Sequence, residues 1–238
     1  MKTIDYILKT ALVYLSPSYA RGVAEKYWIL HDEKYRELRA KQFEDGTIYD
    51  IYRKILKIMN PKKDVSILDA GCGSGELVYY FYNDGYNIRG FDVSPKAVKM
   101  ANKLIGKELC YVDDFLSLKD RTKSYDIVYI YNSLFYIHPK HLKIVFKNFY
   151  DILNDGGKLY IFDVPDFRKR RKWYGTHKWY KRLVLNSVTT LFPVYHPYSA
   201  AFWIKDNHII KNAYECGFRD IIKFDSWSYY RSHYVLHK

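Results

Sequence analysis

A three-glycine turn flanked by two acids is the segment whose residue types and spacing could do chemistry. The turn runs over residues 71–75 as GCGSG, with Asp69 before it and Glu76 after it. Glycines permit positive φ angles and let a ligand approach the main chain, so the turn predicts a binding loop. An apolar run, 65–69, precedes the turn and a helical pattern follows it. The loop is therefore expected at the carboxyl edge of a doubly wound sheet, where such folds bind ligands.

The residues around the turn argue against a phosphate ligand. A dinucleotide pattern that starts at Gly71 would need glycine at position 76, and the chain has Glu76 there. A negative charge at a helix N-terminus disfavours a pyrophosphate. No lysine follows the last glycine, as a P-loop requires. Asp69 suits a cationic ligand group, so a nicotinamide oxidoreductase and a phosphate-binding loop are both disfavoured.

The elements that position this loop alternate between buried strands and amphipathic helices. Such alternation predicts an α/β fold with a doubly wound, parallel sheet covered on both faces. Ser94 is expected to cap the second helix of the sheet region, with Pro95 at its first position. The expected strands are 65–69, 87–92, 110–113, 125–131, 157–164, 221–225 and 229–236, and the expected helices are 76–82, 95–105, 141–153 and 206–216.

Two further segments flank this alternation. Residues 1–60 carry apolar side chains at three- and four-residue spacing and are expected to form an N-terminal helical lid or extension. Residues 61–238 are expected to form the main domain, with 164–203 as a basic insertion on the substrate side. A lid on the sheet edge is favoured for the first helix, and an amphipathic helix lying on a membrane is the alternative.

Composition limits the classes of protein further. The chain has 238 residues, 48% of them hydrophobic and 27% charged, which is typical of one globular domain and not of a disordered protein. It has no apolar run long enough for a transmembrane helix, and its N-terminus is a poor signal peptide. Three widely spaced cysteines argue against a disulfide framework or a zinc site. We therefore expect a cytoplasmic protein without a metal, and peripheral contact with the inner membrane face is kept open.

In its glycine turn the sequence resembles the class I S-adenosylmethionine-dependent methyltransferases, in particular their small-molecule, ubiquinone-biosynthesis-like branch. The first motif of that family, [VIL]-L-D-x-G-C-G-x-G, is matched by ILDAGCGSG at residues 67–75. The family's L-x-x-G-G pattern also recurs at residues 153–157. The resemblance covers roughly residues 60–165. It implies a Rossmann-like, mostly parallel seven-stranded sheet and S-adenosyl-L-methionine as cofactor, with S-adenosyl-L-homocysteine as product.

The resemblance also implies which residues hold the cofactor. Asp92 would accept hydrogen bonds from the ribose hydroxyls, because two vicinal hydroxyls require a carboxylate acceptor. Asp114 would bind the adenine amino group beside Phe115, with Asp113 as the alternative register. The expected cofactor-binding residues are Asp69, Gly71, Cys72, Gly73, Gly75, Asp92, Val93, Asp113, Asp114, Phe115 and Asn132.

The segment after the fourth strand, 132–135 (NSLF), excludes several acceptors by comparison with family motifs. It lacks the prolines of enzymes that methylate base amines and the glutamates of those that methylate arginine. No cysteine stands where a C5-cytosine enzyme needs its nucleophile. A small molecule, a saccharide or a lipid head group therefore remains as acceptor.

A basic segment after the fifth strand suggests the charge of that acceptor. Residues 168–182 contain eight lysines and arginines and no acid, and the whole chain has a net charge of +13. Clustered charge concentrates an oppositely charged substrate. Three anionic acceptors compete: a phosphorylated or nucleotide-linked metabolite or sugar, a lipid-linked intermediate, and RNA. The expected substrate-binding residues are Asp163, Arg168, Arg170 and Trp173.

Methyl transfer from a sulfonium is an in-line displacement, so alignment supplies much of the acceleration. An alcohol acceptor also needs a general base, whereas a carboxylate or phosphate oxygen does not. The candidate catalytic residues are Tyr136, His138, His177 and His196. We expect a methyltransferase that acts on an oxygen, and less readily on a nitrogen, of a small anionic acceptor. An RNA methyltransferase or a non-catalytic nucleic-acid-binding module is the alternative, and the sequence leaves the oligomeric state open.

Overall fold

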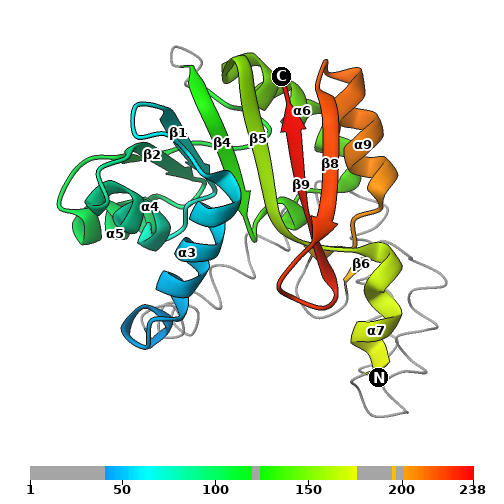
Figure 1. Ribbon diagram of the computed structural model, residues 1–238, viewed down its shortest axis with the longest axis horizontal. Coiled ribbons are helices and arrows are strands. Elements are labelled where there is room, and N and C mark those ends of the chain that lie inside the picture. Colours follow the sequence, from blue (N-terminus) through cyan, green and yellow to red (C-terminus); the bar gives the residue numbers. More distant parts are fainter. Residues whose placement is uncertain (1–40, 120–123, 176–194, 197–200) are drawn as a thin grey trace.

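An open seven-stranded sheet forms the centre of the computed structural model, which describes residues 41–119, 124–175, 195–196 and 201–238 (Figure 1). Its strand order is β3-β2-β1-β4-β5-β9-β8. The first five strands pair in parallel, and β9 runs antiparallel to both β5 and β8, so the expected mostly parallel sheet is confirmed. The strands are β1 (Ser66–Ala70), β2 (Asn87–Asp92), β3 (Cys110–Val112), β4 (Tyr125–Tyr131), β5 (Leu153–Pro165), β8 (Arg219–Asp225) and β9 (Arg231–His237).

Helices cover both faces of this sheet. The first face packs on α3 (Thr47–Met59), α4 (Glu76–Asn83) and α5 (Pro95–Ile105), and the second on α6 (Leu142–Ile152) and α9 (Asp206–Glu215). Alternate residues of β4 enter the two cores: Ile127 and Tyr129 join the first, Val128 and Ile130 the second. Within the ranges given above, no helix has the length and hydropathy needed to cross a membrane.

Local sequence signals set the bounds of the elements nearest the glycine turn. The helix α5 begins where Ser94 Oγ accepts a hydrogen bond from the Ala97 N–H at 3.2 Å, and it ends at Gly106 with a φ of 74°. The expected bounds of β2, β4 and α5 are confirmed residue for residue. Within the helical extension expected over residues 1–60, the structure describes α3, whereas the residues before position 41 lie outside the described part of the chain.

The fifth strand differs from its prediction at both ends. It was expected over 157–164. In the structure β5 begins at Leu153, which pairs with Tyr125, and the turn at Gly156 forms a bulge within the strand. Its far end lies at Pro165, one residue beyond the predicted end at 164. Asp163 stands at a break in register with β9, with a φ of 62°.

The last strand begins two residues later than predicted, because a tight turn occupies residues 226–230. The Arg231 N–H donates to the Ser228 carbonyl at 3.0 Å, and the Ser226 N–H donates to the Arg231 carbonyl at 3.3 Å. This turn places Arg231, the first residue of β9, beside Pro165 at the carboxyl end of β5.

The segment after β5 folds back onto the sheet edge. It forms the turn η3 (Phe167–Lys169) and the short helix α7 (Arg170–Gly175), and later the strand pair β6 (Tyr195–His196) and β7 (Ala201–Phe202). Trp203 is fully buried, and its ring packs against Trp173 and Tyr230 at centroid distances of 6.0 Å. The described part of the predicted insertion is therefore anchored by aromatic packing.

Buried charges connect this segment to β8, β9 and α9. Lys223 Nζ donates to Asp166 Oδ2 and to Asp206 Oδ1, both at 2.7 Å. Ser232 Oγ donates to Asp166 Oδ2 at 2.9 Å, and Tyr234 Oη donates to Asp206 Oδ1 at 2.8 Å. The Asp166 side chain is 1% exposed and that of Asp206 is 10% exposed, so Lys223 pairs with two largely buried carboxylates, and Asp206 also lies 3.3 Å from Arg168 Nη1.

We predict that Lys223→Met destabilises the fold by about 3 kcal/mol, since removing one partner leaves buried charges uncompensated. Urea unfolding followed by circular dichroism measures this loss. Lys211→Met is the matched control: Lys211 is 76% exposed and lies 3.8 Å from Glu215. Its free energy of unfolding is expected to stay within about 0.5 kcal/mol of the wild type. Equal effects of the two substitutions would contradict a structural role for the Lys223 network.

Candidate active site

The glycine turn is held tightly between the ends of β1 and β2. The N–H groups of Gly71 and Cys72 both donate to the Phe91 carbonyl, at 2.8 and 2.9 Å. Gly71 has a φ of 81°, and a Cβ there would lie 2.6 Å from Ser133 Oγ and 3.2 Å from the Phe115 ring. Only glycine fits, so the turn lies directly against the segment that follows β4.

The middle of the turn is open, in contrast to its two ends. A Cβ at Gly75 would lie 2.5 Å from that of Ala101, whereas a Cβ at Gly73 would meet nothing within 4 Å. Asp92 stands beside this space: its Oδ2 accepts from the Gly73 N–H at 3.0 Å and its Oδ1 from the Ser94 N–H at 2.9 Å. Burial raises the pKa of Asp92, and these backbone hydrogen bonds oppose that rise.

The acids after β3 divide into one that shapes the turn and one that is more open. Asp113 is 4% exposed, and its carboxylate accepts from the N–H groups of Asp114 and Lys119. Asp114 is half-buried and caps the Leu116 N–H at 2.8 Å. The Phe115 ring packs edge-on against Phe91 at 5.7 Å and belongs to the core beneath Gly71.

Buried groups lie beneath the turn. Asp69 is 2% exposed and Cys72 is 6% exposed. The Cys72 thiol lies next to the Cys110 thiol although the two are far apart in the sequence, and both are free. Its interaction with Cys110 and its burial raise the pKa of the Cys72 thiol, which disfavours a nucleophilic role. Burial and the Asp69 carboxylate likewise raise the pKa of Tyr129.

These residues fit S-adenosylmethionine, the cofactor that the sequence resemblance implies. The open space at Gly73 admits a ligand to the main chain. Each Asp92 oxygen accepts one backbone N–H and keeps a lone pair for a ribose hydroxyl. Val93 is 53% exposed and offers an apolar surface beside Asp92. The chain could thus hold an adenosine group along the ends of β1 and β2.

A guanidinium connects the ends of β4 and β5. Arg231 Nη1 donates to Asn132 Oδ1, to the Asp163 carbonyl at 2.8 Å and to Asp163 Oδ2 at 3.2 Å. Asn132 and Asp163 both have left-handed backbones, with φ angles of 54° and 62°. Non-glycine residues adopt this conformation at an energetic cost, and they are concentrated at functional sites. Asn132 adjoins Ser133, which contacts Gly71, so this cluster lies beside the glycine turn.

Further side chains hold Asp163 in place. Ser226 Oγ donates to Asp163 Oδ1 at 2.7 Å, and the Asp163 N–H donates to His233 Nδ1 at 2.9 Å. His233 is 1% exposed among the rings of Phe162, Phe224 and Trp227. Burial lowers the pKa of His233 to about 4, so the ring is neutral at physiological pH and its Nδ1 serves as an acceptor.

The four candidate catalytic residues fall in different places. Tyr136 ends the turn η1 (Leu134–Tyr136), is half-buried and packs on Phe135 at 4.6 Å. His138 is 6% exposed, and its Nδ1 accepts from the Lys140 N–H at 3.1 Å. The backbone of His196 forms part of β6, and His177 lies outside the described residues.

The candidate substrate-binding residues of the basic segment make contacts within the protein. Arg168 lies 3.3 Å from Asp206 Oδ2, with 77% of its side chain exposed. Arg170 Nη1 donates to the Phe167 carbonyl at 2.8 Å, and its guanidinium stacks on the Phe167 ring at 3.8 Å. Trp173 packs on Trp203. Among the described residues, these side chains contact neighbours around α7, and most of the Arg168 side chain stays exposed.

Sequence reasoning missed Arg231, Ser133, Ser226 and His233. Arg231 is 99 residues from Asn132 and 68 from Asp163, and no local pattern signals such a pairing. The only available signal was their position, since Ser133 follows a predicted strand and Arg231 lies within another. Parallel strand ends meet at one edge, but the sequence does not say that β9 is inserted beside β5.

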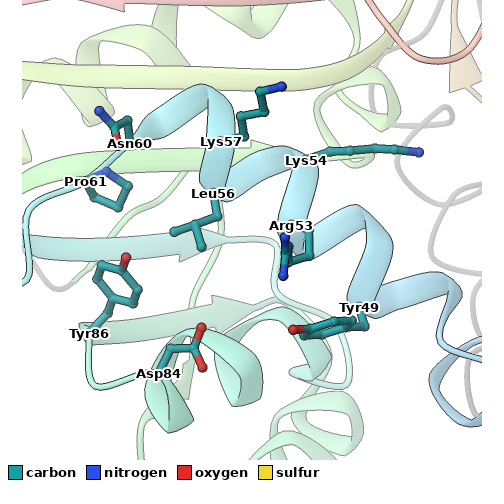
Figure 2. A pocket seen from close by; sticks show the side chains of 9 residues that line it. All are labelled: Tyr49, Arg53, Lys54, Leu56, Lys57, Asn60, Pro61, Asp84 and Tyr86. Atoms are coloured by element: carbon teal, nitrogen blue, oxygen red, sulfur yellow. The ribbon is translucent and has the colours of Figure 1, made fainter.

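A groove at the opposite ends of the strands lies away from this site (Figure 2). It lies near Asn60 and Tyr86, which precede β1 and β2, and is thus at the amino ends of the strands. Figure 2 shows the side chains of Lys54 and Lys57 directed away from Asp84. The Lys54 ammonium instead lies 5.9 Å from the centre of the Trp227 ring.

Comparison with known proteins identifies similar sequences. A family model described as a methyltransferase domain matches residues 67–157. A ubiquinone biosynthesis O-methyltransferase of Pelagibacter ubique (strain HTCC1062) is 28% identical over 180 residues, which cover 67% of this chain and 73% of that protein. A tRNA N(3)-cytidine methyltransferase of Homo sapiens is 26% identical over 143 residues, covering 56% of this chain and 44% of that protein.

Solved structures share the fold. The magnesium protoporphyrin IX methyltransferase of Synechocystis PCC 6803, with bound SAH, superposes with a TM-score of 0.61 at 16% identity. The superposition covers 92% of this chain and 99% of that one. The sequence match to the domain model begins in β1 and ends at Gly157 in β5, so it spans the glycine turn, Asp92 and Asn132.

We predict that Gly71→Ala impairs both stability and cofactor binding. Gly85→Ala is the matched control, because Gly85 has nearly the same φ, 80° against 81°, but open space where a Cβ would stand. The clash with Ser133 should make Gly71→Ala the more destabilising by at least about 1 kcal/mol. Urea unfolding measures the difference, and calorimetry with S-adenosylhomocysteine measures binding. Equal losses in both variants would show that the turn tolerates a side chain.

We also predict that His233 makes stability depend on pH. Its pKa is about 4 in the folded state against 6.5 for an ordinary histidine, so the unfolded chain binds a proton first as pH falls. Its contribution is present above pH 6.5 and is lost towards pH 4, by about 2 kcal/mol between roughly pH 7.5 and pH 5. Urea unfolding of the wild type and of His233→Gln over this interval tests it. An unchanged slope in the variant would assign the pH dependence to other groups.

Proposed function

Because this chain is a class I S-adenosylmethionine-dependent methyltransferase, we propose that it methylates an oxygen of a small anionic acceptor. The acceptor would lie at the carboxyl ends of β4 and β5, next to the cofactor. The proposal assigns the ribose hydroxyls to Asp92, the cofactor's main-chain contacts to the turn at Gly73, and the acceptor side to Asn132, Asp163 and Arg231.

The observation that carries this proposal is the position of Arg231. Its guanidinium is bonded to Asn132, whose neighbour Ser133 would touch a Cβ at Gly71. The positive charge of Arg231 is thus bonded to the residue next to Ser133, where the glycine turn meets the end of β4. The Arg231 side chain is 14% exposed, so solvent reaches it. An anionic substrate that approaches the cofactor from this edge meets a positive charge already oriented by the protein.

For methyl transfer, the main task of this chain is to align the acceptor oxygen with the methyl group of the cofactor. The bound cofactor supplies an electrophilic methyl group on a sulfonium, which is a good leaving group. The residues after β4 and β5 must then hold the acceptor oxygen in line, and such positioning accounts for much of the rate. An acceptor oxygen that is already anionic needs no general base. If the acceptor is an alcohol, Tyr136 is the favoured base, since His138 Nδ1 is engaged with the Lys140 N–H.

Transfer to oxygen is favoured over transfer to nitrogen by three observations. The Pelagibacter relative, which aligns over 73% of its own length, is named an O-methyltransferase. The segment 132–135 lacks the prolines and glutamates with which related enzymes hold amines and guanidinium groups. The Arg231 guanidinium beside Asn132 is also better suited to an anion than to an ammonium acceptor.

RNA is the second candidate acceptor, and the similarity to a human tRNA methyltransferase favours it. That similarity covers 44% of the human protein. The net charge of +13 also favours binding of RNA. Against it, Arg168 and Arg170 are engaged with Asp206 and the Phe167 carbonyl. Affinity for RNA of unrelated sequences that falls steeply with added salt would favour this second candidate.

We predict that Asp92→Ala weakens binding of S-adenosylmethionine and S-adenosylhomocysteine by at least tenfold, about 1.4 kcal/mol. The substitution removes the acceptor for the ribose hydroxyls. Isothermal titration calorimetry of both ligands measures the change. Asp225→Ala is the control, since the Asp225 side chain is 86% exposed and pairs only with Lys169 among the described residues.

Unchanged affinity in Asp92→Ala would remove Asp92 from the cofactor site. Failure of the wild type to bind either ligand would contradict the proposed reaction as a whole. In that case RNA and anionic lipid vesicles are the next ligands to titrate.

A further inference from the structure

Toward the residues that the structure describes, the guanidinium of Arg231 uses one of its three nitrogens. The three recorded hydrogen bonds to Asn132 and Asp163 all start from Nη1. Arginine has five N–H donors, of which Nη1 carries two. The other three, on Nε and Nη2, have no acceptor among the residues that the structure describes. The Nε–H and one N–H of Nη2 point in parallel along one edge of the guanidinium.

Aromatic rings fix the orientation of this edge. The guanidinium carbon lies 5.0 Å from the centre of the Phe135 ring and 5.0 Å from that of Tyr230. Together with the hydrogen bonds of Nη1, these contacts restrict both the position and the rotation of the group. The side chain keeps 14% of its surface exposed, so its unused donors are fixed in place and not sealed off from solvent.

We infer that the Nε–Nη2 edge of Arg231 binds a carboxylate of the acceptor through two parallel hydrogen bonds. The inference rests on the proposed function and narrows the acceptor class from an anion to a carboxylic acid. A planar carboxylate matches the spacing of two parallel guanidinium N–H groups, and such bidentate pairs add geometric specificity to their strength. The residue then determines which acceptors enter and how they are oriented.

The neighbouring charges favour a monoanion over a phosphate. Asp163 Oδ2 lies 3.2 Å from Nη1 and offsets part of the positive charge of Arg231. Lys169 Nζ restores some of it, since it donates to the Arg231 carbonyl at 2.7 Å and to Asp225 at 2.6 Å. The charges of Arg231 and Lys169 are thus nearly cancelled by those of Asp163 and Asp225. A second negative charge on a phosphate would therefore be poorly compensated. A single carboxylate charge is satisfied by the guanidinium edge alone.

The location couples this edge to the reaction. Nη1 holds Asn132 and Asp163, the left-handed residues that follow β4 and break β5. Asn132 is one residue from Ser133, whose hydroxyl lies against Gly71. A carboxylate on the opposite edge of the same rigid group is therefore placed at a fixed distance from the glycine turn. In-line transfer depends on such a fixed distance.

The test is proton–nitrogen NMR of arginine Nε–H groups in the full chain saturated with S-adenosylhomocysteine. Benzoate, benzamide and phenyl phosphate are titrated as probes, and the Arg231 signal is assigned by its loss in Arg231→Lys. We expect benzoate to shift this signal with saturation and benzamide to leave it in place. In Arg231→Lys and Arg231→Gln, benzoate affinity measured on the ligand's own signals should fall at least tenfold.

Arg219→Gln is the matched control, because Arg219 Nη1 also donates to backbone carbonyls, those of Gly217 and Phe218 at 3.1 Å. It starts β8 opposite His237, at the far edge of the sheet, and its loss should leave benzoate affinity unchanged. Arg231→Lys retains a positive charge but only a point donor, so retained affinity in it would show that charge alone suffices and would overturn the bidentate site.

The remaining outcomes are also decisive. An Arg231 signal that benzoate does not move overturns the inference, while shifts caused by S-adenosylhomocysteine in the same sample leave the methyltransferase assignment intact. Phenyl phosphate binding tenfold tighter than benzoate would replace the carboxylate by a phosphate. The benzoate titration is repeated without S-adenosylhomocysteine, so a failure of cofactor binding is seen separately from a failure of the arginine site.

Discussion

The close contact between Gly71 and Ser133 is the constraint on which the rest of the site depends. The turn after β1 passes so near the segment after β4 that no side chain fits, and two N–H groups fix it to the Phe91 carbonyl of β2. Three strand ends are thereby brought to one point. Asp92 then reaches the open middle of the turn, and Asn132 stands on its other side. The proposed cofactor side and the proposed acceptor side of the site both depend on this one packing contact.

Arg231 extends that arrangement across the sheet. It enters from β9, the antiparallel strand, and joins residues that follow β4 and interrupt β5. Neighbouring side chains hold the left-handed backbone at Asn132 and Asp163: Arg231 binds both residues, and Ser226 and His233 bind Asp163. The buried Lys223 network fixes the same strands from the other side of β9. The proposed acceptor side is thus held by contacts from separate segments of the chain.

Residues whose constraints are local were predictable from the sequence, and those paired over long distances were not. The bounds of α5 follow from Ser94, Pro95 and Gly106, all adjacent to the helix. The glycine turn and Asp92 were found because a known motif places them after consecutive strands. Arg231, by contrast, meets Asn132 only because β9 inserts beside β5, 99 residues later in the chain. The register break at Asp163 likewise depends on this pairing, and no local pattern in the sequence signals it.

Hydrogen–deuterium exchange of the full chain with and without S-adenosylhomocysteine shows whether the ligand binds where the ends of β1, β2 and β4 converge. We predict slower exchange in residues 71–76, 92–95 and 131–136, with no change in residues 49–61 beside the groove of Figure 2. Protection confined to residues 49–61, or absent throughout, would contradict this prediction, because the constrained turn at Gly71 would then not be the binding loop.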